Sequence, residues 1–140
     1  MSYNLNRFLK AQESDYARAL SEIKAGHKRS HWMWYIFPQV KGLGFSSMSR
    51  HYGIADIGEA KAYMENPVLR DRLLEITEAL LTLKGNDVSD VMGYPDDLKL
   101  RSSMTLFALA APECEVFQKV LDKYFHGEKD QKTIQILKGK

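Results

Sequence analysis

Apolar residues in this chain recur at intervals of three and four, the spacing that places side chains on one face of a helix. The clearest example has apolar side chains at Leu69, Leu73, Ile76, Leu80 and Leu83. No long segment alternates apolar and polar residues as a strand would, and no Asn-Gly hairpin turn is present. The pattern predicts an all-α protein.

Proline and glycine fall where these helices are expected to begin and end. Asn66-Pro67 begins the helix described above, and Gly85 follows its end. Along the chain this interpretation gives about eight short helices in one compact domain, residues 1–140, packed as an irregular orthogonal bundle. At the N-terminus it separates a short helical segment around Leu5–Gln12 from a helix that Ser14 caps. Further caps are expected at Ser30, at Ser46 or Ser47, and at Asp56, Asp87 and Asp130.

The composition is typical of a soluble globular protein, with 44% hydrophobic and 27% charged residues. A chain of 140 residues is long enough to bury a core without disulfides or structural metal. The single cysteine, Cys114, excludes an internal disulfide, and its acidic neighbours predict an inert thiol. The N-terminus lacks the apolar region of a signal peptide, and the longest apolar run, Trp32–Phe37, is too short to cross a membrane. We expect a cytoplasmic protein.

The segment Ser30–Phe45, SHWMWYIFPQVKGLGF, concentrates large aromatic rings beside polar side chains and glycines. Such a segment forms either the wall and lip of a pocket or the core and exit of a short buried helix. In the second case Ser30 caps the helix and Pro38 ends it, because the residue before a proline avoids the helical region. Its six-residue apolar run covers most of the circumference of a helix, so we expect it to be buried nearly all round.

Two segments together resemble a known protein family. They are KRSHWMWYIFPQVKGLGFSSMSRHYGI, Lys28 to Ile54, and DDLKLRSSMTLF, Asp96 to Phe107. With the order of the helices between them, they resemble the bacterial family called domain of unknown function 1810, over nearly the whole chain. The resemblance implies an α-helical fold and implies no particular activity.

Both segments place polar groups beside apolar runs, and such groups need partners when they are buried. We therefore expect the two segments to meet around a shared cleft. The alternative is that each polar set caps its own helix. The predicted ligand-binding residues are His31, Trp34, Gln39, Lys41, Gly44 and Ser46 from the first segment, and Asp97, Lys99, Arg101 and Ser102 from the second.

His31 is the candidate catalytic residue, because histidine exchanges protons near neutral pH. The alternative is a core histidine bonded to a backbone carbonyl. His27 and His31 are four residues apart, but Gly26 and Ser30 interrupt a helix there and no third ligand lies nearby. We therefore predict no metal, and the sequence indicates no cofactor.

Two narrower motifs are also consistent with ordinary structure. The stretch KGLGFSS, Lys41 to Ser47, offers amide groups to a phosphate if a helix begins there, but it is neither a P-loop nor a dinucleotide fingerprint. Lys99 and Ser103 have the spacing of a Ser–Lys nucleophile pair, yet no oxyanion hole is evident. An ordinary loop and a capped helix N-terminus are the favoured explanations of these residues.

The charge distribution favours an anionic ligand. The net charge is +2, but residues 1–50 carry +5 and residues 51–140 carry −3. The leading hypothesis is a pocket, built from Ser30–Ser47 and Asp96–Ser103, for a small anionic, nucleotide-like molecule. One alternative is a nucleic-acid-binding module using Arg7, Lys24, Lys28, Arg29, Lys41 and Arg50, although the modest net charge makes nucleic acid a less favoured partner. The other is a protein-interaction adaptor without catalytic activity. Whether the protein is an enzyme, and its oligomeric state, stay open.

Overall fold

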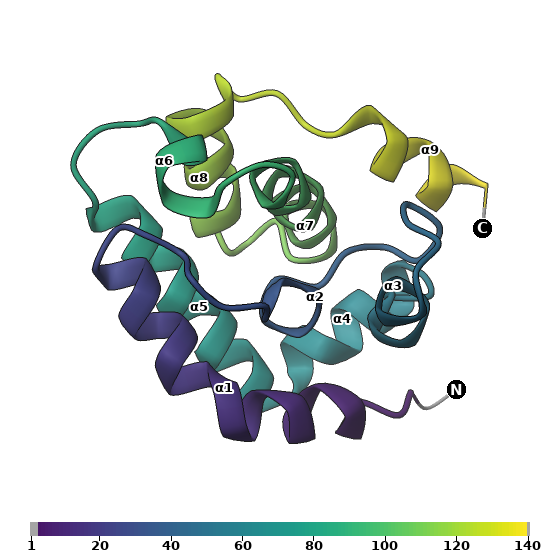
Figure 1. Ribbon diagram of the computed structural model, residues 1–140. Coiled ribbons are helices and arrows are strands. Elements are labelled where there is room, and N and C mark those ends of the chain that lie inside the picture. The colour runs from purple at the N-terminus through teal and green to yellow at the C-terminus, as the bar shows by residue number, and fades with distance from the viewer. Residues whose placement is uncertain (1–2, 140) are drawn as a thin grey trace.

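The computed structural model describes residues 3–139, which fold as an irregular bundle of helices in one compact domain (Figure 1). The helices are α1 (Asn6–Lys24), α2 (Met33–Ile36), α3 (Ser47–Tyr52), α4 (Ile57–Glu65), α5 (Pro67–Thr82), α6 (Val88–Met92), α7 (Asp96–Ala110), α8 (Val116–Phe125) and α9 (Gln131–Lys138). Within the described residues the one strand-like feature is a parallel bridge between Val40 and Ile54. The all-α prediction is confirmed. None of these helices is both long and apolar enough to cross a membrane.

Helix α7 lies at the centre of the bundle, where it packs against α4, α6, α8 and α9. Residues 102–107 are buried without interruption, so this middle stretch of the helix is covered on all sides and not along one stripe. The ring of Phe107 joins its neighbours: its centroid lies 5.2 Å from that of Tyr63 in α4 and 5.7 Å from that of Phe117 in α8. The start of this central helix therefore has a fixed position relative to the rest of the fold.

Local signals correctly predicted several helix boundaries. Asn66 accepts hydrogen bonds from the backbone N–H groups of Val68 and Leu69, and Pro67 opens α5. Asp56, Asp87 and Ser46 likewise cap α4, α6 and α3. The predicted apolar face of α5 is buried at Leu69, Leu73, Ile76 and Leu80.

The N-terminal region differs from the prediction, because α1 is one continuous helix from Asn6 to Lys24. Ser14 lies inside it and caps nothing; its hydroxyl donates to the carbonyl of Ala11, 3.3 Å away. A serine that bonds the preceding turn is tolerated in a helix interior. Gly26, with φ of +80°, follows the end of α1, as predicted.

The aromatic segment also begins differently from the prediction. Ser30 does not cap it: the short helix α2 starts at Met33, and the Ser30 hydroxyl donates to the Glu22 carboxylate at 2.6 Å. Trp32 and Phe37 are fully buried, and Ile36 is 2% exposed. Trp34 is only half-buried, so the expectation of burial nearly all round holds for most of the run.

The Glu22 carboxylate anchors this segment to α1. It accepts four hydrogen bonds, from the backbone N–H of Arg29, the backbone N–H and hydroxyl of Ser30, and the indole N–H of Trp32. Burial alone would raise the pKa of Glu22, but these hydrogen bonds outweigh it and lower the pKa from 4.5 to about 2. The ionised carboxylate therefore stabilises the fold.

Trp32→Ala should lower the free energy of unfolding by about 3–5 kcal/mol, because it leaves a large cavity and removes one of the four hydrogen bonds to Glu22. Phe45→Ala, at a side chain that is 78% exposed, should change it by less than about 0.5 kcal/mol. Urea unfolding followed by circular dichroism measures both. Equal effects of the two substitutions would contradict the burial of Trp32.

The Glu22 interaction should make stability depend on pH. Because the folded-state pKa is depressed, the stabilisation is complete above about pH 4.5 and is lost as the pH falls towards about 2. Unfolding measured from neutral pH down to about pH 2 should show a smaller loss for Glu22→Gln than for the wild type. Glu78→Gln, at an exposed site, should retain the wild-type profile. A wild-type profile for Glu22→Gln would refute this role.

Candidate functional site

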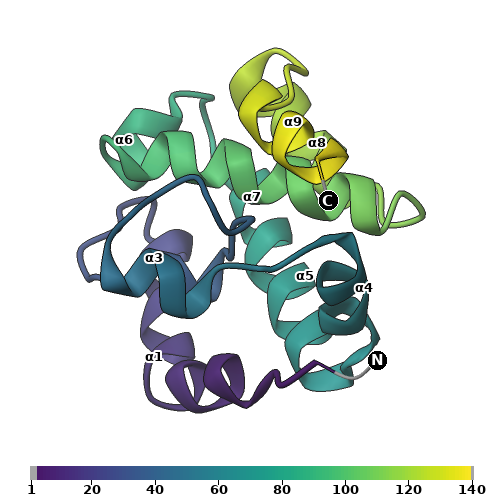
Figure 2. The ribbon, with the colours of Figure 1, turned by 90° about the vertical axis from the view of Figure 1, so that its right-hand side faces the viewer.

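The two segments singled out in the sequence meet at a cavity of about 410 Å³. Figure 2 shows the connection between α2 and α3 running past the N-terminal half of α7, with α9 beside them. One wall comes from residues 34–53: Trp34, Gln39, Val40, Leu43, Gly44, Ser49, Tyr52 and Gly53. The other comes from Pro95, Leu98, Lys99, Arg101 and Ser102, together with Asp130 and Lys132 at the start of α9.

The first wall depends on close backbone packing between the connecting loop and α3. A Cβ at Gly53 would lie 2.8 Å from the carbonyl oxygen of Ser49 and 2.9 Å from Cα of Lys41, so only glycine fits there. Tyr52 supplies an aromatic surface, and its ring centroid is 5.1 Å from that of Tyr35. The close backbone approach at Gly53 and the contact of Tyr52 with Tyr35 therefore hold this wall in position.

The second wall is the first half of α7, whose side chains are held by neighbouring elements. Arg101 donates from Nη2 to the carbonyl of Lys129 at 3.0 Å. The hydroxyl of Ser102 lies 2.8 Å from Oδ2 of Asp130. Because both contacts reach the chain just before α9, they join the cavity wall to the C-terminal helix.

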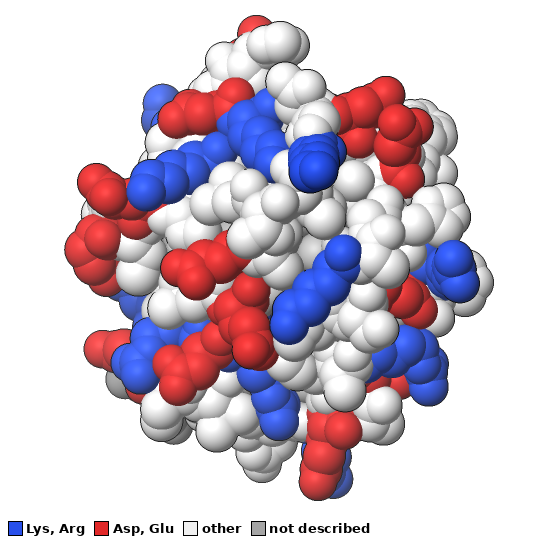
Figure 3. Space-filling model, turned by 90° about the vertical axis from the view of Figure 1, so that its left-hand side faces the viewer, with Lys and Arg blue, Asp and Glu red and all other residues white. Residues whose placement is uncertain are grey.

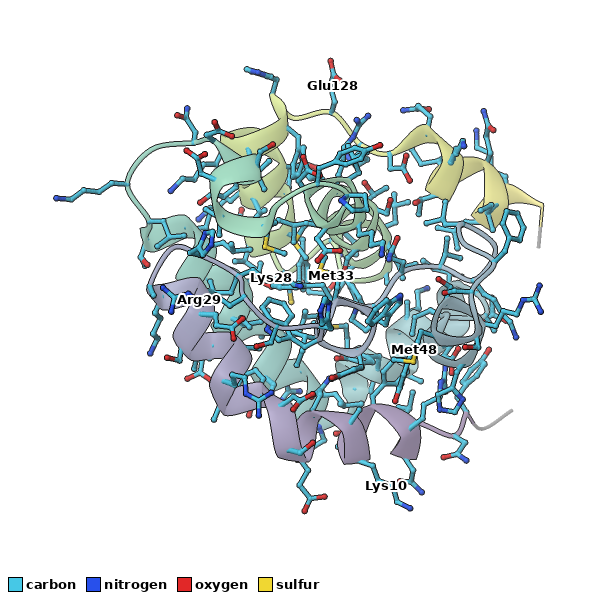
Figure 4. The ribbon with its side chains drawn as sticks, in the orientation of Figure 1. Lys10, Lys28, Arg29, Met33, Met48 and Glu128 are labelled. Atoms are coloured by element: carbon cyan, nitrogen blue, oxygen red, sulfur yellow. The ribbon has the colours of Figure 1, made fainter. Side chains whose placement is uncertain are left out.

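A shared carboxylate at the start of α7 holds Lys99, which lines the second wall, and Lys28 from the segment before α2. Asp96 pairs with Lys28 at 2.7 Å and with Lys99 at 3.6 Å. Each ammonium group also lies over an indole ring: Lys28 is 4.8 Å from the Trp32 centroid, and Lys99 is 5.1 Å from that of Trp34. In Figure 4 Lys28 lies towards the middle of the molecule, consistent with its 6% exposed side chain. Lys99 is thereby fixed beside the cavity.

Two N–H donors of cavity-lining residues are buried without a hydrogen-bond partner among residues 3–139. They are the indole Nε1 of Trp34 and Nε of Arg101. A buried donor that has lost water and gained no acceptor destabilises the fold by about 1–3 kcal/mol. Among residues 3–139, three further buried side-chain atoms lack a partner, and these belong to residues outside the lining: Arg7 Nε, Thr77 Oγ1 and Ser103 Oγ.

The cavity also has an excess of positive charge. Lys99, Arg101 and Lys132 line it together with one acidic residue, Asp130. Lys99 shares Asp96 with Lys28, whereas neither Arg101 nor Lys132 has an acidic partner in the described part of the chain. A half-buried guanidinium without a carboxylate suits an anion with planar or tetrahedral oxygens.

The structure places six of the ten residues predicted to bind a ligand around this cavity: Trp34, Gln39, Gly44, Lys99, Arg101 and Ser102. It does not place His31 there. Because Trp32 turns into the core, the side chain of His31 is exposed to solvent, and the expected position in the cleft is corrected. It is not a core histidine either.

The other three predicted residues also lie outside the lining. Lys41 is exposed, while the Ser46 hydroxyl caps α3 by accepting the N–H of Ser49 at 3.1 Å. Asp97 is 8% exposed and accepts hydrogen bonds from Ser89 and from the N–H of Leu98. For Ser46 and Asp97 these contacts supply a structural role.

Sequence reasoning missed Asp130, Lys132 and Tyr52 as cavity residues. Asp130 and Lys132 lie far along the chain from both segments, and no local motif marks them.

The half-buried Cys114 lies outside this cavity, and burial and the Glu113 carboxylate raise the pKa of its thiol. No three metal-binding side chains of the described residues are grouped to hold a metal ion.

Removing either partner of the Lys28–Asp96 pair should have unequal effects. Asp96→Asn leaves a nearly buried ammonium group without its carboxylate and should lower the free energy of unfolding by about 3 kcal/mol. Lys28→Met removes that charge, and Asp96, which is 21% exposed, retains Lys99. It should therefore be less destabilising. Urea unfolding of both variants measures the difference, and the reverse order would contradict this account.

Comparison with known proteins identifies the family and leaves the activity open. No curated protein matches the chain. A conserved hypothetical protein from Mycobacterium tuberculosis, known from a crystal structure, is 43% identical, with a TM-score of 0.94 and 96% of each chain covered. The model of the family described as "Protein of unknown function (DUF1810)" matches residues 2–137. The chain thus belongs to the DUF1810 family.

Proposed function

We propose that this protein binds a small anionic, nucleotide-like molecule in the cavity between the α2–α3 segment and α7. The observation that carries the proposal is Arg101. Its guanidinium lines the cavity, its Nε is buried without a partner, and no acidic side chain within residues 3–139 pairs with it. An anionic oxygen in the cavity would pair with the positive charge of this guanidinium.

The other cavity residues suit the remainder of such a ligand. Lys99 and Lys132 add positive charge, while Trp34 and Tyr52 offer aromatic surface to a planar ring. A free metabolite of this kind agrees with the cytoplasmic location that the sequence predicts.

The basic N-terminal third gives less support to a nucleic-acid interface. Arg7 pairs with Glu59 at 3.1 Å, and Lys28 is nearly buried against Asp96, so neither cation is available to phosphates. Figure 4 places Lys10 and Arg29 at separate edges of the molecule. On the face shown in Figure 3, acidic and basic side chains are intermixed, whereas nucleic-acid surfaces gather cations on one face.

A protein-interaction role is the second candidate, and exposed apolar side chains favour it. Phe45 is 78% exposed and follows Gly44 of the cavity wall; Tyr94 is 81% exposed and precedes Pro95. Leu98, itself a lining residue, is 48% exposed. Such side chains near one cavity suit a protein partner as well as a ligand.

Arg101→Met should weaken ligand binding by about tenfold or more, because it removes a charged hydrogen-bond donor and keeps much of the side-chain volume. A thermal-shift screen of nucleotides and anionic metabolites at several salt concentrations comes first. The probe for titration is AMP, and adenosine is the comparison ligand that lacks the phosphate. Isothermal titration calorimetry measures the dissociation constants.

The matched control is Arg29→Met, which makes the same chemical change at an exposed site outside the cavity. It should bind within about twofold of the wild type. If no anion in the screen stabilises or binds the wild type, the proposal is wrong and the protein-interaction candidate gains support. Equal losses in both arginine variants would also contradict a site at Arg101.

A further inference from the structure

Among residues 3–139, Asp130 is the one acidic residue that lines the cationic cavity, and its carboxylate is held firmly. Its Oδ2 accepts hydrogen bonds from Ser102 Oγ at 2.8 Å and from Thr133 Oγ1 at 2.6 Å. Its backbone N–H donates to Thr105 Oγ1 at 2.9 Å. Three contacts, two of them to the central helix α7, therefore fix the position and orientation of this group.

Helix capping does not explain this carboxylate. Asp130 occupies the N-cap position of α9, where an aspartate normally accepts a backbone N–H of the first turn, but its side chain accepts none. The sequence prediction of an Asp130 cap is therefore wrong for the side chain. Its second oxygen, Oδ1, forms no hydrogen bond or ion pair with any residue from 3 to 139. This lining residue therefore uses Oδ2 within the fold, and its Oδ1 accepts no hydrogen bond from residues 3–139.

A fixed negative charge is unfavourable in a cavity that holds only an anion. It becomes favourable when the same ligand also carries hydroxyl groups, since a hydroxyl donates to a carboxylate in a strong, charge-assisted bond. Arg101, Lys99 and Lys132 attract the anionic group, and Asp130 accepts from hydroxyls a few atoms away in the same molecule. The cavity therefore combines receptors of opposite charge.

We propose that Asp130 is a specificity determinant that recognises the sugar hydroxyls of a phosphorylated ribose, either as a ribonucleotide or as a free sugar phosphate. This inference rests on the proposed function and narrows its ligand class. The phosphate interacts with the cations of the cavity, and Oδ1 of Asp130 accepts from the 2′-hydroxyl. A 2′-deoxyribose lacks that donor and leaves the carboxylate unpaired beside the ligand.

The test measures discrimination between ribose and deoxyribose. Calorimetric titration compares AMP, 2′-deoxy-AMP and ribose 5-phosphate on the wild type, Asp130→Asn and Asp71→Asn. Asp71→Asn makes the same charge change on α5, at a side chain that is 71% exposed and outside the cavity. The amide oxygen introduced by Asp130→Asn can still accept the Ser102 and Thr133 hydroxyls, and thermal melting confirms that each variant is folded.

The wild type should bind AMP about tenfold or more tightly than 2′-deoxy-AMP, as expected for a hydrogen bond to a charged group. Asp130→Asn should reduce this preference to about twofold or less and still bind phosphate-bearing ligands, while Asp71→Asn should keep it. If ribose 5-phosphate and AMP bind with equal affinity, the ligand class is a sugar phosphate. If ribose 5-phosphate binds much more weakly than AMP, the ligand class is a ribonucleotide.

Two results would overturn the inference. Equal affinity of the wild type for ribose and deoxyribose forms is one, and an undiminished preference in Asp130→Asn is the other. If the wild type binds another anion from the screen but none of these three probes, the ribose inference fails and the anion site stands. If it binds no anion at all, the proposed function fails together with this inference.

Discussion

Hydrogen bonds between the buried middle of α7 and the chain before α9 govern the structure around this helix. Thr105 is completely buried, and its hydroxyl donates to the carbonyl of Arg101 while accepting the N–H of Asp130. Ser102 contacts the carboxylate of the same aspartate. These bonds fix the path of the chain before α9, so the packing of α7 determines where the C-terminal helix lies.

The same helix serves two environments along its length. Its second half joins the aromatic core through Phe107, whereas its first turns carry Lys99 and Arg101 to the cavity. A site on a rigid central helix has less freedom than a site on loops alone. The facing wall reaches comparable rigidity by another route, through the close approach of Gly53 to the backbone of Ser49 and Lys41.

The sequence predicted the fold and only part of the cavity. The physical cause is that helix caps depend on neighbouring residues, whereas cavity residues depend on contacts between distant elements. Caps at Asp56, Asn66 and Asp87 depend on a few neighbouring residues, so the local pattern suffices. The role of Ser30 depends on Glu22 of another element, and for that reason the helix expected from a Ser30 cap, with His31 facing the cleft, does not form. Asp130 is held beside the cavity by contacts with α7, which no local motif encodes.

The attachment of α9 has a thermodynamic consequence. This helix buries only Thr133 among its own residues, and it rests on the loop at Gly42, where an added Cβ would lie 3.6 Å from Ile136. A lightly anchored helix opens locally at a lower free energy than the whole domain unfolds. Any molecule that contacts Lys132 or Asp130 in the cavity adds its binding free energy to the free energy of opening this helix. Amide hydrogen exchange in α9 and occupancy of the cavity are thus two measures of one equilibrium.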